Sequence, residues 1–183
     1  VTLMRIAIDV RTITPTSSGI GLCVYQLVKS LSQIDKSNEY FLFSLKGNEL
    51  LREFPANFNI YETNIKVDSH PLSELWENIN QLKYLNSNQI QVLHNPAFRL
   101  PFFSVKFKKI VTIYDLVAYL FPNTVPKLFA SYMRFIIPIA IKKADWIIAP
   151  SQNTAKDICN FFPKAENKLS IIHAAATENY SPL

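Results

Sequence analysis

The sequence predicts a single α/β domain built on a doubly wound, mostly parallel sheet of about six or seven strands. Short runs rich in β-branched and aromatic residues alternate along the chain with longer segments whose apolar residues recur every three or four positions. The chain has 183 residues, of which 49% are hydrophobic and 18% charged. A chain of this length and composition can bury one core without disulfides or structural metals.

Seven short runs are expected to be strands, because each is dense in Ile, Val, Leu or aromatic residues and is bounded by polar turns. The runs are nearly continuous in apolar residues, which is typical of parallel strands buried on both faces. They cover residues 3–9, 40–45, 57–61, 91–94, 109–113, 146–149 and 169–172.

Helical spacing predicts helices between most of these strands. Thr124 is expected to cap the longest helix, with Pro126 in its first turn and Pro138 bending its interior. Ser151 is expected to cap the last one. The expected helices cover residues 20–34, 49–54, 73–85 and 124–143, and a further stretch after Ser151.

Parallel α/β sheets bind ligands at the carboxyl ends of their strands, so the loop after the first strand is a candidate site. This loop closes on Gly19, Ile20 and Gly21, where backbone N–H groups at a helix start can approach a phosphate. A plain turn is the alternative. A dinucleotide-binding fingerprint needs a further glycine where Val24 stands, so a dehydrogenase is disfavoured.

Four polar candidates lie at the ends of other strands at the same expected edge: His94, Tyr114, Asp115 and Ser151. Ser151 is a candidate substrate-binding residue as well as the expected cap. Asp115, after Tyr114, is suited to hydrogen-bond a sugar hydroxyl or, alternatively, to cap the next segment. His94 ends a strand before Asn95, and is either a ligand-facing or a structural histidine. The three histidines lack the spacing of a metal site, so no metal is expected, and no nucleophilic triad motif is present.

The net charge of +5 favours anionic partners but falls short of a dedicated nucleic-acid binder. Residues 99–109 interleave bases with aromatics, a pattern compatible with an anionic membrane surface, with single-stranded nucleic acid, or with a solvated loop that leads into a strand. No signal peptide or bilayer-spanning segment is expected, since the longest apolar stretch, 128–141, is too short. Cys23 and Cys159 are expected to be buried free thiols.

Several segments together, in order and spacing, resemble the N-terminal domain of the retaining group 1 (family 4) glycosyltransferases. The resemblance covers nearly the whole chain. It is carried by residues 4–9, 18–21, 38–43, 112–116, 121–122, 143–151 and 169–173.

The resemblance implies a GT-B architecture, in which two Rossmann-like domains face each other across a cleft. Residues 1–173 would form the acceptor-side domain and 174–183 would begin the linker to an absent donor-binding domain. Such enzymes transfer a sugar from a nucleoside-diphosphate sugar to a glycan or lipid-linked acceptor with retention, without a metal cofactor. By position, Gly19 and Gly21 would lie near the donor diphosphate, and Asp115 with Tyr114 near the transferred sugar.

The resemblance implies a cytoplasmic protein. Such enzymes often work at the inner membrane face, which adds weight to the membrane interpretation of residues 99–109. Many members carry His where this chain has Tyr114, and the final motif, often Pro-Asn-Gly, reads His173-Ala174-Ala175 here. A phenol does not exchange protons near neutral pH as an imidazole does. The chain alone is expected to be nearly inactive. A stand-alone binding module and a GT-B sugar-nucleotide epimerase are the alternatives.

Overall fold

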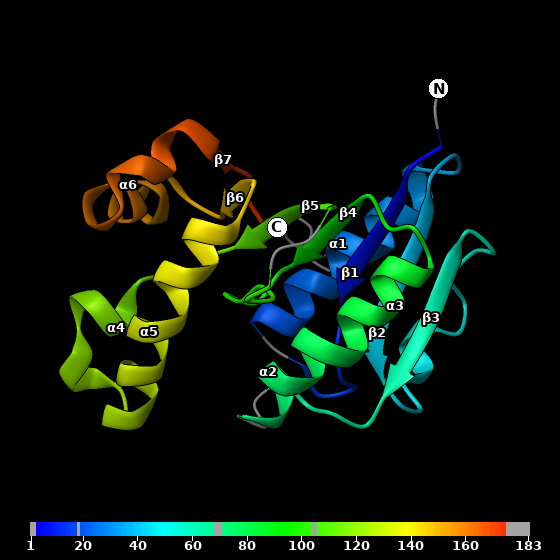
Figure 1. Cartoon of the computed structure of the whole chain (residues 1–183), viewed down its shortest axis with the longest axis horizontal. Coiled ribbons are helices and arrows are strands. Elements are labelled where there is room, and N and C mark those ends of the chain that lie inside the picture. Colours follow the sequence, from blue (N-terminus) through cyan, green and yellow to red (C-terminus); the bar gives the residue numbers. More distant parts are fainter. Residues whose placement is uncertain (1–2, 18, 68–70, 104–105, 175–183) are drawn as a thin grey trace, which may run out of the picture.

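Seven parallel strands form one sheet in the computed structural model, which describes residues 3–17, 19–67, 71–103 and 106–174 (Figure 1). The strand order is β3-β2-β1-β4-β5-β6-β7. All six pairings are parallel, so the predicted Rossmann-like α/β class is confirmed. The strands are β1 (Arg5–Asp9), β2 (Glu39–Leu45), β3 (Phe58–Thr63), β4 (Val92–Asn95), β5 (Lys108–Thr112), β6 (Trp146–Ala149) and β7 (Leu169–Ile171).

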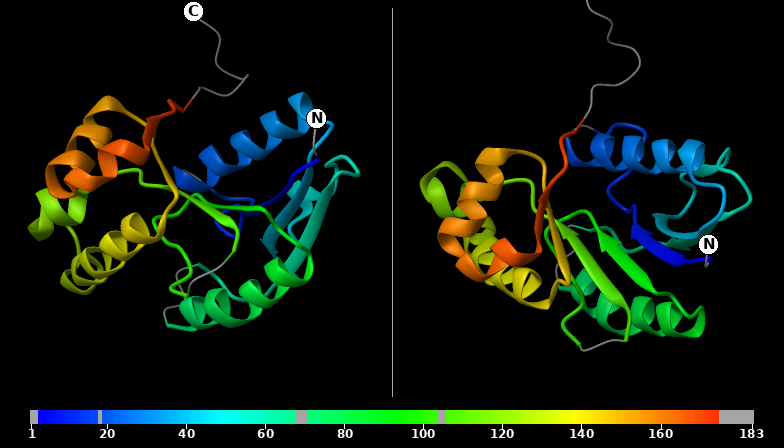
Figure 2. Two further views of the ribbon diagram at one scale, coloured as in Figure 1. Left: turned by 45° about the horizontal axis from the view of Figure 1, so that its top comes forward. Right: turned by 90° about the horizontal axis from the view of Figure 1, so that it is seen from above.

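The helices cover the two faces of the sheet unequally. Figure 2 shows α1 on one side of the sheet and α2 and α3 on the other. The cores agree: α1 packs on Ile8 and Leu42, whereas α3 packs on Ala7 and Leu93. The helices are α1 (Ile20–Ile34), α2 (Leu72–Trp76), α3 (Leu82–Ser87), α4 (Val117–Leu120), α5 (Lys127–Lys143) and α6 (Gln152–Phe161), with short turns η1 (Glu49–Leu51), η2 (Glu77–Gln81), η3 (Pro122–Thr124) and η4 (Pro163–Lys168).

The direction of each crossover explains this inequality. Connections from one parallel strand to the next are right-handed, so the direction of travel across the sheet selects the face. The chain moves one way from β1 to β2 and the opposite way from β3 to β4, β5 to β6 and β6 to β7. Helix α1 therefore lies on one face, while α3 and α5 share the other, where α5 packs on Val111 and Ile147.

Three local expectations differ from the structure. Thr124 does not cap the long helix: its hydroxyl donates to the Phe121 carbonyl in η3, and α5 begins after Pro126. The expected helix over 73–85 contains a π-helical turn, η2, between α2 and α3. Helix α4 was not expected. Ser151 does cap α6, since its Oγ accepts the Thr154 N–H.

Candidate functional site

The chain reverses its direction of travel between β1 and β4, which lie side by side in the sheet. Such a topological switch opens a crevice at the carboxyl ends of the strands. The loops after β1, β4, β5 and β6 converge there. All the site residues that the sequence predicts lie in these loops or at the ends of the elements beside them: Gly19, Ile20, Gly21, His94, Tyr114, Asp115 and Ser151.

A pocket of about 340 Å³ lies on the α1 face of the sheet, between α1 and β4, β5 and β6. Helix α1 is the one described helix on this face, which leaves room beside it. Two predicted residues line the pocket, His94 and Tyr114. The other lining residues were not predicted as site residues, and they include Cys23, Thr112 and His173.

His94 lies on the floor of this pocket and is almost fully buried. One of its ring nitrogens, Nε2, lies 2.9 Å from the Thr112 hydroxyl on the neighbouring strand. Burial lowers the pKa of His94 to about 4. The imidazole is therefore neutral at neutral pH, and it offers a hydrogen bond to the pocket rather than a charge.

We expect this histidine to make the folded state less stable in acid. Its folded pKa lies below the ordinary value of 6.5. Between these two values the unfolded chain therefore binds a proton that the folded chain does not, and stability is lost as the pH falls from 6.5 towards 4. The shift corresponds to roughly 3 kcal/mol. Urea unfolding across this window, with His94→Gln as the control, measures it. An identical pH dependence in the control would contradict the assignment.

Tyr114 and Asp115 follow β5 but point to different surroundings. Tyr114 is half-buried in the pocket, and burial raises the pKa of its phenol to about 12, so the hydroxyl keeps its proton and can donate a hydrogen bond. Asp115 is exposed, and its Oδ1 accepts the Val117 N–H at 3.0 Å at the start of α4. The sequence offered capping of the next segment as an alternative role for Asp115, and this hydrogen bond is such an interaction. The other carboxylate oxygen, Oδ2, takes no part in it.

The two glycines at the start of α1 serve different backbone requirements. Gly19 has φ of +54° and ψ of −119°, a conformation that favours glycine. At Gly21 a Cβ atom would lie 2.3 Å from the Thr12 carbonyl oxygen, so the missing side chain lets the preceding loop pack on the helix. Among the described residues no side chain caps this N-terminus, whereas the Ile20 side chain packs into the core. Any contact of Ile20 with a ligand would therefore come from its backbone.

Several basic and aromatic side chains of residues 99–109 are buried, although the sequence pattern suggested that they could face an anionic surface. Arg99, Phe107 and Lys109 are buried, while Phe103, Lys106 and Lys108 are exposed. Among the described residues of 99–109, buried side chains therefore interrupt the basic and aromatic pattern, as in the alternative of a loop that leads into a strand. The physical reason is that half of its aromatic and basic side chains serve the core, the ion cluster described next and strand β5.

A buried ion cluster lies at the same sheet edge, on the face opposite the pocket. Arg11 makes two contacts to Asp9, through Nε at 2.9 Å and Nη2 at 2.6 Å, and its Nη2 also lies 2.6 Å from Glu77 Oε1. Arg99 Nη2 reaches the same Glu77 oxygen at 2.6 Å. The Arg11 guanidinium stacks over Trp76 at 4.4 Å. Burial raises the pKa of Glu77, while the attraction of Arg99 and Arg11 opposes that effect.

This cluster was missed because its members are far apart in the sequence. Glu77 stands 66 residues after Arg11 and 22 before Arg99. The ion cluster joins the loop after β1, the helical segment of α2 and η2, and the loop after β4, and so supports the crevice. The π turn η2 begins at Glu77, and π turns are frequent at functional sites. The one local signal was Arg11 two residues after the terminal acid of β1.

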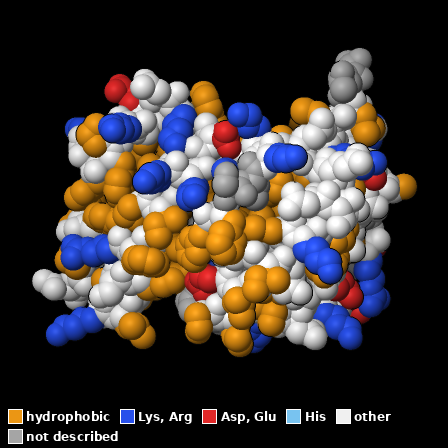
Figure 3. Space-filling view, viewed as in Figure 1, with side chains coloured by type: hydrophobic (Ala, Val, Ile, Leu, Met, Phe, Trp, Pro, Cys, Tyr) orange, Lys and Arg blue, Asp and Glu red, His pale blue; other side chains and the backbone are white. Residues whose placement is uncertain are grey.

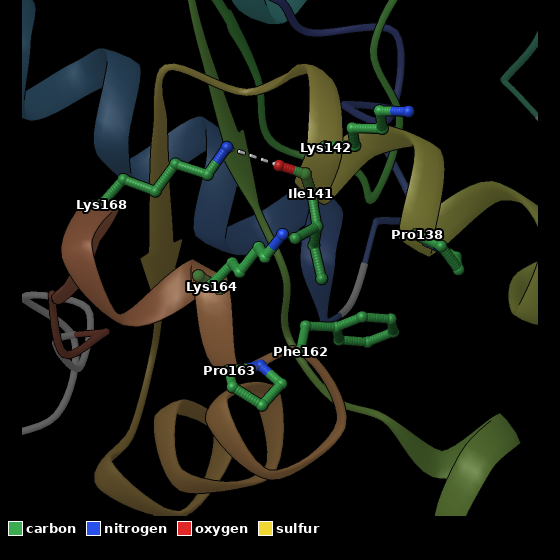
Figure 4. Close-up of a pocket in the computed structure, with 8 residues that line it drawn as sticks. Pro138, Ile141, Lys142, Phe162, Pro163, Lys164 and Lys168 are labelled. Carbon is green, nitrogen blue, oxygen red and sulfur yellow. Dashed lines mark hydrogen bonds between the residues drawn. The ribbon is translucent and has the colours of Figure 1, made fainter.

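A second pocket, of about 500 Å³, lies between the C-terminal end of α5 and η4 (Figure 4). Lys168 extends across it and donates to the Ile141 carbonyl at 2.7 Å and to the Ala144 carbonyl at 2.6 Å. These bonds satisfy carbonyls at the end of α5. The pocket is near the amino ends of the strands, because α5 leads into the start of β6, and so it is remote from the crevice.

The described residues contain no helix long and apolar enough to cross a membrane. They also contain no group of three His, Cys, Asp or Glu side chains placed to hold a metal ion. Cys23 and Cys159 are free thiols and are half-buried rather than fully buried. His70 and the linker residues 175–183 lie outside the described part of the chain.

The sequence profile of Glycosyltransferase Family 4 matches residues 17–176. No curated protein sequence matches the chain. Among solved structures, Anabaena Alr3699/HepE in complex with UDP and glucose is similar with a TM-score of 0.61 and 12% identity, covering 99% of this chain and 48% of that one.

A glycosyltransferase from Rickettsia africae ESF-5 has a TM-score of 0.55 and 18% identity, covering 94% of this chain and 43% of its own. The lipopolysaccharide outer core galactosyltransferase WaaB has a TM-score of 0.54 and 13% identity, with 93% and 45% covered. At these identities the likeness shows the fold. The chain spans less than half the length of each of these proteins.

Proposed function

Because the chain belongs to glycosyltransferase family 4, we propose that it forms the acceptor-side half of an enzyme that transfers a sugar from a nucleoside-diphosphate sugar. The acceptor would be a glycan or a lipid-linked saccharide, and transfer would proceed with retention and without a metal. The donor-binding half would be a second domain. One observation carries the proposal: the family match, over residues 17–176, includes every candidate residue at the sheet's crevice.

The residues at the crevice are suited to neutral hydroxyl and anionic phosphate groups. The start of α1 presents backbone N–H groups beside β1, which suits a diphosphate approaching from the facing domain. Tyr114 and neutral His94 offer hydrogen bonds in the pocket without adding charge. Asp115, which follows Tyr114 in the chain, supplies an exposed carboxylate that can accept hydrogen bonds from sugar hydroxyls.

The test is transfer by the two-domain enzyme that the proposal describes, compared with the chain alone. UDP-glucose is the first donor probe, because UDP and glucose are named in the structure of the similar Anabaena protein. Mass spectrometry of acceptor mixtures detects transfer, and the anomeric configuration of the product reports retention. Turnover of several sugar nucleotides without any requirement for an acceptor would contradict the proposal and favour epimerisation. We expect the chain alone to show at most about one thousandth of the transfer rate, since it holds half of the cleft.

A further inference from the structure

The pocket between α5 and η4 has walls made chiefly of apolar side chains. Its volume of about 500 Å³ falls in the range of small-molecule sites. The apolar lining consists of Pro138, Ile141, Phe162, Pro163 and Ala165. Proline rings have no freely rotating side chain, and the ring of Phe162 is held by an edge-on contact with Tyr119, with 5.6 Å between the ring centroids. The walls are therefore largely preformed, and a ligand would not have to order them.

The same pocket carries positive charge. Of the described residues, three lysines and no acidic residue line it, namely Lys142, Lys164 and Lys168. Figure 4 shows Lys164 and Lys168 extending towards the α5 side of the pocket, whereas the amine of Lys142 points away from them. Lys164 makes no hydrogen bond or ion pair within the described part of the chain. Figure 3 shows Lys and Arg side chains gathered around η4 and the C-terminal end of α5, so the surroundings of the pocket are cationic as well.

Lys168 uses only part of its capacity to donate hydrogen bonds. Its ammonium donates to the carbonyls of Ile141 and Ala144, and a third N–H remains. Burial lowers the pKa of Lys168, because the ammonium has lost part of its hydration. The carboxylate that attracts Lys168 is that of Asp145, which is already paired with Lys108 at 3.1 Å. An anion in the pocket would therefore compensate a charge that the protein leaves partly unsolvated.

The acidic residue of η4 does not neutralise the pocket. Glu166 is exposed and does not line it. Burial and the charge of Glu166 raise the pKa of the Cys159 thiol, which places Glu166 beside α6 instead. An inorganic anion would use the lysines but would not need the apolar walls, and a neutral apolar compound would not need the lysines. The lining fits a ligand that has both an anionic group and an apolar body.

We propose that this pocket binds a small amphipathic anion, whose flat apolar ring lies against Phe162 and the proline rings and whose phosphate or carboxylate group is bound by Lys164 and by the remaining N–H of Lys168. Helix α5 leads into β6 and η4 leads into β7, so the ligand would join the segments that precede two neighbouring strands. The pocket is remote from the crevice, so the inference does not rest on sugar transfer.

The experiment is an NMR titration of the isotope-labelled chain with three soluble probes. Naphthyl phosphate has both parts of the proposed ligand, naphthol has the ring alone, and inorganic phosphate has the anion alone. We expect naphthyl phosphate to bind with a Kd below about 1 mM, and at least about tenfold more tightly than either of the other probes. The backbone amide signals of η4 and of the C-terminal end of α5 should shift.

Variants of the lining test each half of the proposed contact. Lys164→Gln should weaken the binding of naphthyl phosphate about tenfold, because it removes a charged donor. Phe162→Leu should weaken it about fivefold, because it removes the aromatic surface. Lys142→Gln should have at most about a twofold effect, since its amine points away from the other two. The matched control is Lys156→Gln on α6, an exposed lysine outside the pocket lining, which should leave the affinity unchanged.

Three outcomes would overturn the proposal. Equal affinities for the three probes would indicate adventitious binding only. Unchanged affinity in Lys164→Gln would show that this lysine does not bind the anion, and signal shifts centred on the start of α1 would place the probe at the crevice. If Phe162→Leu fails to fold, Lys164→Gln decides alone, because that side chain is exposed. Lys168 is left intact, since its bonds to the carbonyls of α5 support the fold.

Discussion

Arg11→Met should lower the free energy of unfolding by about 3–5 kcal/mol, the largest effect we expect from any single substitution outside the apolar core. The Arg11 side chain is fully buried and is paired with both Asp9 and Glu77 at 2.6 Å. Methionine fills similar space but leaves two carboxylates facing each other with only Arg99 to compensate. Urea denaturation at neutral pH measures the loss.

The matched control for this prediction is Arg52→Met. Arg52 pairs with Glu49 at 3.1 Å, but both side chains are about 70% exposed. Such a pair contributes at most about 0.5 kcal/mol, because water already solvates both charges. Arg11→Lys should fall between the two variants, since it keeps the charge but loses the two-pronged contact to Asp9. A loss below about 1 kcal/mol for Arg11→Met would show that the cluster does not support the crevice as we describe.

Asp115→Asn in the proposed two-domain enzyme should lower the turnover of sugar transfer by about 100-fold. The substitution keeps an amide oxygen that can accept the Val117 N–H, so the cap of α4 is retained. It removes only the negative charge that we assign to the sugar-binding side of the crevice. Initial rates at saturating donor and acceptor measure the effect.

Two comparisons make this test specific to the charge. Asp115→Ala removes both the cap and the charge, and should cost about 1 kcal/mol of stability in addition to the lost turnover. Asp157→Asn changes another acidic residue, on α6 away from the pocket lining, and should leave the rate unchanged. If Asp115→Asn retained full activity while Asp115→Ala only destabilised the protein, the residue would be a helix cap and no more.

Local chemistry was enough to predict the elements and their class. The runs that became β1 to β7 are apolar because both faces of a parallel sheet are covered, and that pattern is visible without coordinates. Ser151 was recognisable as a cap because an N-cap acts on the N–H groups two or three residues away. Thr124 carried the same signal, but Pro122 and Pro126 around it favoured a separate turn, η3.

Position along the chain also predicted which loops would meet. Because the carboxyl ends of parallel strands share one edge, the loops holding Gly19, His94, Tyr114 and Ser151 had to converge there. The sequence did not reveal that Gly21 is needed for space against Thr12, since that contact depends on how the loop folds back. Nor did the sequence show whether the Asp115 carboxylate binds the Val117 N–H, as it does in the structure, or is left for a ligand.

The sequence by itself determined the fold class and the edge of the sheet at which the candidate residues lie, because these follow from periodicity and from the order of strands. The family was indicated separately, by the resemblance of several ordered motifs. Only the tertiary structure decided the ion cluster of Arg11, Glu77 and Arg99, the burial of His94 and the exposure of apolar side chains on α2 and α5. Each of these depends on side chains that are remote in sequence. A helical pattern shows which residues share a face, but the packing of the neighbouring helix decides whether that face meets protein or water.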